Sequence, residues 1–345
     1  MNVLLVTAHS IASYDDVRML HELGHQVFNL DAYVDPAHPH VDTRPPLMDV
    51  PAFPDLIAAV DRLGTQDNLT AAKERLPDEL LDWADVAIFH HYLDRWMVPN
   101  FHALRRAGVR VIWRTCGQSD FRLEDLMRPY RDAGLEVVRY SPAEARFFEP
   151  SGHWAGADAT IRFGKFLEDF PAWTGPLEGA EPFVANVTQD MAGRGEYCGL
   201  TFWTRATAGL KAAPAGPGSE HLPGGLGALP YRTMLDYLAQ AAVYLYTGTV
   251  PASYTLGLME AMLVGVPVVS IGAEAWAGPA ELFEGHELAA PAKADTPELA
   301  RDLLRGLMGN PPLAAELSRQ QRARAAELFD VQAVGAQWAQ LLGQP

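Results

Sequence analysis

The sequence predicts an α/β protein made of two domains, each built around a parallel sheet. The chain has 345 residues, which is more than one ordinary core accommodates and suits two domains. Short apolar runs alternate with stretches of helical period in two series, separated by a break at 150–182 that is rich in glycine, proline and aromatic residues. Such alternation is typical of parallel sheets with helices on both faces.

The first series starts at the N-terminus. VLLVTA (3–8) has the pattern of a buried strand, and DDVRMLHELGHQV (15–27) predicts a helix that stops at Gly24, with a strand, QVFNL, after it. The segment 35–54 is rich in proline and histidine and predicts a loop. The remaining predicted helices are 55–63, 68–82, 101–108 and 123–134, and the remaining strands are 86–92, 109–115 and 135–141.

The second series starts at PFVANV (182–187), a predicted strand. Strands follow at 211–216, 243–248 and 266–272, and helices at 202–210, 231–241 and around 256–264, before a helical tail at about 296–342. A glycine-rich loop occupies 214–230. We therefore expect an N-terminal domain at 1–165, a C-terminal domain at 166–328, and a last helix at 329–345 that packs back on the N-terminal domain.

The charge distribution limits the classes of partner. Hydrophobic residues make up 48% of the chain, charged residues make up 20%, and the formal net charge is −16. This balance fits a globular protein and argues against non-specific attraction to nucleic acid or anionic membrane. The segment Arg105 to Arg146 departs from the average, because its nine arginines and six acids give a local charge of +3. Two interpretations stay open: ion-paired helix faces, or a surface for an anionic acceptor such as a modified nucleic-acid base.

Cysteine usage and apolar runs bear on the compartment. The two cysteines, Cys116 and Cys198, offer neither a disulfide framework nor zinc-site spacing. No apolar run reaches membrane-spanning length, and the apolar run at the N-terminus is short and lacks a basic flank. The sequence favours a cytoplasmic protein without membrane insertion.

One stretch of the second series combines a helix start with a single acid. YTGTVPASYTLGLMEAMLVGVPVVSIG (246–272) holds an apolar helix pattern interrupted by Glu260. The free N–H groups at a helix start suit a phosphate, and a carboxylate one turn further along suits the hydroxyls of a sugar. The alternatives are that Ser253 and Thr255 are simple N-caps and that Glu260 is an exposed surface acid.

This stretch resembles the donor-binding segment of retaining GT-B glycosyltransferases of the large family-four group, whose pattern is E-G-F-G-L-P-x-x-E-A-M-A-x-G-x-P-V-V. The matching residues are Glu260, Ala261, Met262, Gly265, Pro267, Val268 and Val269. Weaker likeness extends over most of the chain, through ELGHQV, RYSPAEARFF and RFGKFLEDF. Two departures stand out: Ala252 replaces the first glutamate of the pattern, and Ser253-Tyr254-Thr255 replaces its G-F-G.

The resemblance implies a GT-B-like fold, in which two Rossmann-like, doubly wound domains face a central cleft. It also implies a metal-independent, hexosyltransferase-like enzyme that moves a sugar from a nucleotide-sugar donor to an acceptor hydroxyl with retention of configuration. The acceptor binds the first domain and the donor binds the second. No D-x-D motif ends a strand and no His/Asp cluster has metal spacing, so we expect neither a metal nor a cofactor. A non-catalytic nucleotide- or sugar-binding module, favoured by Ala252, and a GT-B-related nucleotide-sugar epimerase remain alternatives.

The resemblance and the positions at strand ends give each candidate residue a role. Main-chain N–H groups would bind the donor phosphates at Ser253, Tyr254, Thr255 and Leu256, while Glu260 would bind the ribose hydroxyls. Arg194 would neutralise the diphosphate and assist catalysis, unless it is an ordinary loop arginine. His90 and His91 end a predicted strand and are the catalytic candidates of the first domain, the alternative being satisfied or exposed histidines. The acceptor-side candidates, in turns after strands, are His9, Ser10, Thr115, Gln118 and Ser119.

Overall fold

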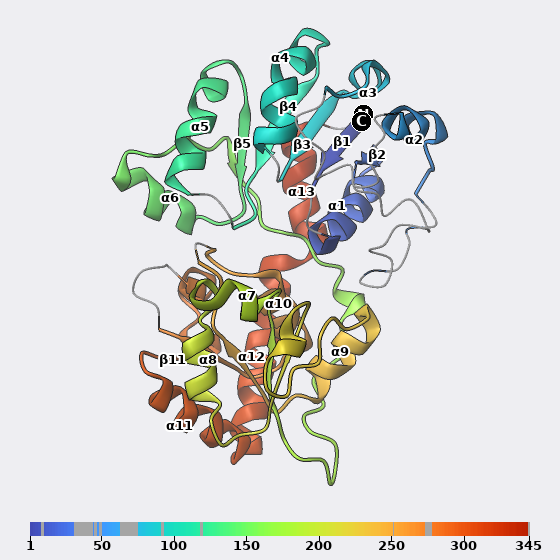
Figure 1. Ribbon diagram of the computed structural model, residues 1–345. Helices are drawn as coiled ribbons and strands as arrows, with labels where there is room; N and C mark the ends of the chain where they lie inside the picture. The colour runs from blue at the N-terminus through green and yellow to red at the C-terminus, as the bar shows by residue number, and fades with distance from the viewer. Residues whose placement is uncertain are drawn as a thin grey trace. The chain divides into compact units, whose positions relative to one another are not determined.

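The computed structural model of the chain confirms two α/β units with parallel sheets (Figure 1). It describes residues 1–7, 10–30, 44, 47, 50–62, 75–90, 93–117, 120–250, 252–272 and 278–343. The first unit comprises Met1–Lys165 and Val331–Pro345, and the second comprises Phe166–Asp330. Each unit has its own sheet and its own apolar core.

The first unit contains a six-stranded sheet in the order β2-β1-β3-β4-β5-β6, and all of its strand pairs are parallel. Its strands are β1 Asn2–Val6, β2 Gln26–Asn29, β3 Val86–Phe89, β4 Arg110–Arg114, β5 Glu136–Arg139 and β6 Ala159–Thr160. Its helices are α1 Ser10–Glu22, α2 Pro54–Asp61, α3 Asp78–Trp83, a π-helical turn η1 Leu93–Met97, α4 Val98–Arg106, α5 Phe121–Asp132, α6 Ala143–Phe148 and α13 Val331–Leu342. Strand β6 lies inside the predicted connection at 150–182, where two paired residues are too few to produce a periodic pattern.

The second unit contains a five-stranded parallel sheet in the order β11-β10-β9-β7-β8. Its strands are β7 Val184–Val187, β8 Ala212–Ala215, β9 Val243–Tyr246, β10 Val268–Ile271 and β11 Ala292–Ala294. Its α-helices are α7 Met191–Arg194, α8 Leu200–Ala206, α9 Tyr231–Gln240, α10 Leu256–Val264, α11 Pro297–Met308 and α12 Pro311–Phe329. In a parallel sheet of this kind, ligands bind beyond the carboxyl ends of the strands.

The helical tail predicted at 296–342 consists of three helices, α11, α12 and α13. Asn310 caps α12 by accepting the Leu313 N–H through Oδ1 at 3.2 Å, and Pro311 occupies the first helical position. A cap followed by proline starts a new helix, because proline lacks the N–H that a continuing helix would use. A second break at Asp330 separates α12 from α13.

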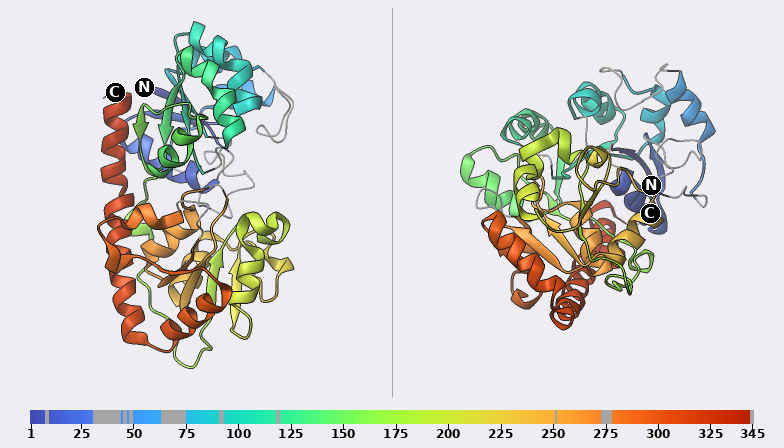
Figure 2. Two further views of the ribbon diagram at one scale, coloured as in Figure 1. Left: turned by 90° about the vertical axis from the view of Figure 1, so that its left-hand side faces the viewer. Right: turned by 60° about the horizontal axis from the view of Figure 1, so that its bottom comes forward.

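The last helix, α13, belongs to the first unit and lies beside α1 (Figure 2). The Val331 N–H donates to the Lys165 carbonyl at 3.0 Å, and Arg110 donates to the carbonyl oxygens of Leu341 and Leu342 at 3.2 Å each. The C-terminal segment is therefore held at both of its ends. Within the described ranges, no helix is both long and apolar enough to cross a membrane.

Candidate functional site

Two segments that are distant in sequence meet at the carboxyl edge of the second unit's sheet. One follows β7 and comprises 188–199, and the other follows β9 and comprises 247–250 and 252–257. β7 and β9 are neighbours in the sheet, and Figure 1 shows α7 and α10 at the same end of this unit. The Val250 N–H donates to the Tyr197 carbonyl at 2.8 Å, and a Cβ added to Gly199 would lie 3.1 Å from the Thr247 Cβ. We define these two segments together as the donor loops.

Helix α10 starts directly against the end of β7. A Cβ at Gly257 would lie 2.6 Å from the Val187 carbonyl oxygen, so only glycine allows this approach. Thr255 is the N-cap, and its hydroxyl accepts the Leu258 N–H at 3.3 Å. Among the described residues, the N–H groups of Leu256 and Gly257 have no hydrogen-bond acceptor. The helix start therefore leaves donors available to an anion.

The side chains of Ser253 and Tyr254 face the protein interior. Both residues are buried, and the Tyr254 ring packs on Phe329 with ring centroids 5.7 Å apart. Any contact of Tyr254 with a ligand at the helix start would therefore come from its main chain. The phosphate role of Ser253, Tyr254, Thr255 and Leu256 stays a prediction, and Thr255 is in addition an N-cap.

Glu260 is not a surface acid. The residue is 1% exposed and lies in a helix whose other residues from 257 to 264 are all buried. Burial raises the pKa of the neighbouring Tyr244 hydroxyl, and its hydrogen bond with Val187 lowers it. The negative charge of Glu260 raises the pKa of Tyr244 further. A buried carboxylate requires polar surroundings, and Glu260 lies one turn into α10. The predicted ribose contact stays a prediction.

Arg194 is the last residue of α7, in the donor loop after β7. Its Nη1 donates to the Gln189 carbonyl at 3.5 Å, and within the described residues it forms no salt bridge. Burial raises the pKa of the Cys198 thiol, while the charge of Arg194 lowers it. Among the acids that the structure describes, none therefore neutralises the charge of Arg194.

In the first unit, His90 follows β3 and joins a buried ionic cluster with Asp16 of α1 and Arg114 of β4. The His90 Nε2 lies 3.3 Å from Asp16 Oδ2, and Arg114 Nη1 donates to both Asp16 oxygens at 3.1 Å. The Arg114 guanidinium also lies over the Phe163 ring at 4.3 Å and the Trp338 ring at 4.9 Å. The His90 side chain is 0% exposed. A catalytic role for His90 stays a prediction, and in this structure the imidazole contacts the ionic cluster and not solvent.

The cluster makes stability depend on pH in a defined direction. Burial raises the pKa of Asp16 from 3.8 to about 6, although Arg114 lowers it. Between these values the folded state binds more protons at Asp16 than the unfolded chain does, so its contribution to the free energy of unfolding falls as the pH rises. We therefore expect the unfolding free energy of the wild type minus that of Asp16→Asn to decrease from pH 4 to pH 6. Urea unfolding at several pH values measures this difference, and a difference that grows with pH would contradict the assignment.

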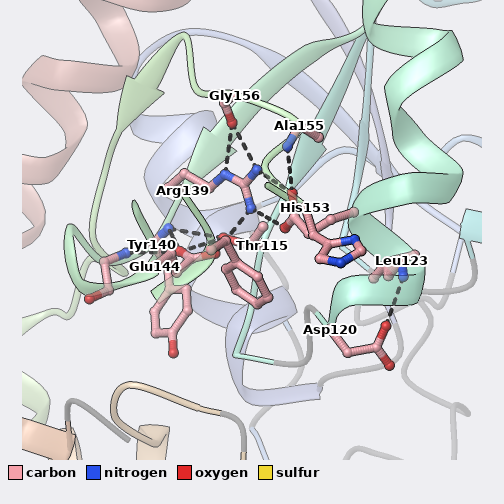
Figure 3. A network of polar contacts seen from close by, with 12 residues as sticks. Thr115, Asp120, Leu123, Arg139, Tyr140, Glu144, His153, Ala155 and Gly156 are labelled. Atoms are coloured by element: carbon pink, nitrogen blue, oxygen red, sulfur yellow. Dashed lines mark hydrogen bonds and ion pairs between the residues drawn. The ribbon is translucent and has the colours of Figure 1, made fainter. Parts of the chain in front are cut away.

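Thr115, at the end of β4, belongs to a second buried network (Figure 3). Its hydroxyl donates to Glu144 Oε1 at 2.8 Å and accepts the Tyr140 N–H at 3.1 Å. Arg139 donates to the two Glu124 oxygens at 2.6 and 2.9 Å and to the Gly156 carbonyl. The predicted acceptor contact of Thr115 stays a prediction, and its hydroxyl is engaged within the fold.

Several predicted residues lie outside the described part of the chain. These are His9, His91, Gln118 and Ser119. Ser10 is the first residue of α1, and only its main chain is described. The predictions for these five positions stay predictions.

Many arginines of the arginine-rich segment, Arg105 to Arg146, form ion pairs with acids of the first unit. Among the described residues, at least five of its nine arginines form ion pairs with acids of that unit: Arg110 with Glu136, Arg114 with Asp16, Arg128 with Asp125, Arg131 with Asp158, and Arg139 with Glu124. This supports ion-paired helix faces over a dedicated surface for an anionic acceptor.

The chain has the fold of several known glycosyltransferases. It aligns over 100% of its length with 98% of a sucrose-phosphate synthase from Thermosynechococcus elongatus (15% identity, TM-score 0.68) and with 100% of Anabaena HepE in complex with UDP-glucose (13%, 0.69). It also aligns over 99% of both chains with an α-glucosyltransferase in complex with UDP and a 13-mer DNA containing a HMU base (10%, 0.62). No protein-family model and no curated protein sequence matches the chain. The predicted fold class, two Rossmann-like domains of the GT-B kind, is therefore confirmed.

Proposed function

We propose that the protein is a glycosyltransferase that transfers a sugar from a nucleotide-sugar donor to an acceptor hydroxyl. The donor binds the second unit and the acceptor binds the first. The observation that carries the proposal is the meeting of the donor loops, which brings the Arg194 segment to the segment that opens α10. Within the described part of the second unit, the N–H groups of Leu256 and Gly257 have no acceptor and Arg194 forms no salt bridge. A diphosphate requires groups of this kind.

The chemistry follows from this arrangement. A nucleoside diphosphate leaves with added negative charge on its terminal phosphate, and the N–H groups of Leu256 and Gly257 together with the Arg194 guanidinium stabilise that charge as it develops. Glu260 accepts hydrogen bonds from the ribose hydroxyls. Transfer with retention is proposed from the resemblance of 243–272 to the family-four segment. Similar structures that hold UDP or UDP-glucose support a nucleotide-sugar donor.

We propose that the arginine and the helix N–H groups replace a metal ion at the diphosphate. Addition of EDTA should therefore leave the rate of donor turnover unchanged, because no step depends on a divalent cation. The release of nucleoside diphosphate, measured with and without the chelator, tests this expectation. A rate that falls with EDTA and recovers with Mg²⁺ would contradict it.

The acceptor is proposed to be a hydroxyl of a molecule other than a nucleic acid. The similar α-glucosyltransferase carries a DNA with a HMU base, so a modified base is the alternative to test. The net charge of −16 and the internal pairing of five of the nine arginines weigh against a polyanion.

A second candidate function is a non-catalytic module that binds a nucleotide or a sugar. Ala252 at the position of the first family-four glutamate favours it, because that glutamate is expected beside the reacting carbon of the sugar. Binding without turnover of the bound nucleotide sugar would establish this alternative. An epimerase would be recognised by conversion of the nucleotide sugar without any acceptor.

A thermal-shift panel tests the proposed function. The wild type is heated alone and with UDP, GDP, ADP, CMP or dTDP, and then with the corresponding nucleotide sugars. A ligand that binds the folded state raises the melting temperature by mass action. We expect one nucleotide and its sugars to raise it and Arg194→Ala to reduce the shift. A panel in which no ligand raises the melting temperature would overturn the proposal.

A further inference from the structure

Asp190 has an unusual main-chain conformation within the donor loop that follows β7. Among the described residues, it is the single non-glycine residue with positive φ, at φ 49° and ψ 47°. Left-handed conformations are disfavoured for residues with a Cβ, although asparagine and aspartate adopt them more readily than most. Such outliers gather where the surrounding structure fixes a functional geometry.

The carboxylate of Asp190 is held in a narrow space between two loops. Its Oδ1 accepts the Gly193 N–H at 3.0 Å, which caps α7. A Cβ added to Gly193 would lie 2.5 Å from Oδ2, and one added to Gly218 would lie 2.6 Å from Oδ1. Glycine at both positions therefore makes room for this one side chain.

The main chain of Asp190 joins the loop after β7 to the loop after β8. Its N–H donates to the Pro217 carbonyl at 2.6 Å, and the Thr188 N–H donates to the Ala215 carbonyl at 3.1 Å. Its own carbonyl accepts the Arg194 N–H at 2.8 Å. The position of the Arg194 main chain is therefore fixed through Asp190.

We propose that Asp190 is a positioning residue that holds Arg194 in the geometry that receives the donor diphosphate. This inference rests on the proposed function. Asp190 itself does not contact the ligand in this proposal, because its carboxylate accepts the Gly193 N–H in the first turn of α7. The side chain acts through its hydrogen bond and its left-handed main chain, and its negative charge is not needed.

Three substitutions of Asp190 should therefore differ in nucleotide affinity. Asp190→Asn keeps both an acceptor oxygen for Gly193 and a tolerance for positive φ, so we expect wild-type or tighter nucleotide affinity. Asp190→Ala loses the cap and disfavours the left-handed main chain, so we expect affinity to fall about tenfold. Asp190→Gly keeps the main-chain conformation and loses only the cap, and its affinity should lie between the other two.

Calorimetric titration tests the proposal, with the nucleoside diphosphate that gives the largest shift in the panel as the probe. Asp236→Ala is the matched control, since Asp236 is exposed on α9 of the same unit. The melting temperature of each unliganded variant separates loss of fold from loss of positioning. With the nucleotide sugar as substrate, Asp190→Ala should raise KM more than it lowers kcat.

The outcomes are distinguishable. A wild type that binds no nucleoside diphosphate overturns the proposed function and this inference with it. A wild type that binds, together with a folded Asp190→Ala that binds equally well, overturns the inference alone. If Asp190→Ala does not fold, Asp190→Gly decides, and wild-type affinity in that variant would overturn the inference. Weakened binding in the alanine variant with rescue in the asparagine variant supports it.

Discussion

Glu260→Gln should weaken nucleotide binding by about a hundredfold, equivalent to about 2.7 kcal/mol. The carboxylate is proposed to accept hydrogen bonds from two ribose hydroxyls, and hydrogen bonds to a charged acceptor are about twice as strong as neutral ones. Glutamine has the same shape, so the buried position in α10 should remain filled. Titration of the variant with the nucleotide selected by the thermal-shift panel measures the loss.

The control for Glu260→Gln is Glu298→Gln. Both acids lie on helices of the second unit, but Glu298 is exposed in the first turn of α11, where it pairs with Arg205 at 2.8 Å. We expect the control to bind nucleotide as the wild type does. Equal affinity of the wild type and of a folded Glu260→Gln variant would show that Glu260 does not contact the nucleotide.

Arg139→Ala should lower the free energy of unfolding of the first unit by about 4 kcal/mol. The guanidinium is buried, pairs with both oxygens of Glu124 and lies 3.4 Å from Glu144 Oε2 (Figure 3). Its removal leaves these carboxylates buried without their cation, which costs more than the pair itself contributes. The guanidinium also lies 3.9 Å from the centroid of the Trp154 ring. Urea unfolding of the wild type and the variant, followed by circular dichroism, measures the loss.

Arg128→Ala is the matched control for this loss. Arg128 pairs with Asp125 at 3.1 Å on the exposed surface of α5, and exposed pairs contribute about 0–1 kcal/mol. A cost of Arg139→Ala no larger than that of the control would contradict a stabilising role for the buried network.

The elements around the donor loops could be predicted because their signals are local. Helix α10 has an apolar pattern with a glycine after it, and strand β10 follows. Each of these signals depends on residues close in sequence. The burial of Glu260 was also open to prediction, since a helix that is apolar on all sides is a buried helix.

The contacts that assemble the sites were not predictable, because they join distant residues. Asp16 and Arg114 are 98 positions apart, and an acid pair near the start of α1 has the pattern of a solvated helix face. A related reason explains why no role was predicted for Asp190, Gly199 or Thr247. Their roles depend on which strand ends are neighbours. β11 was missed because three residues carry no measurable period.

A crystal structure of the protein with the nucleoside diphosphate selected by the panel tests the central claim most directly. We predict that the terminal phosphate lies within hydrogen-bond distance of the Leu256 and Gly257 N–H groups and of the Arg194 guanidinium, with the ribose hydroxyls on Glu260. A nucleotide bound away from α10 and the loop after β7 would contradict the assignment of the donor site.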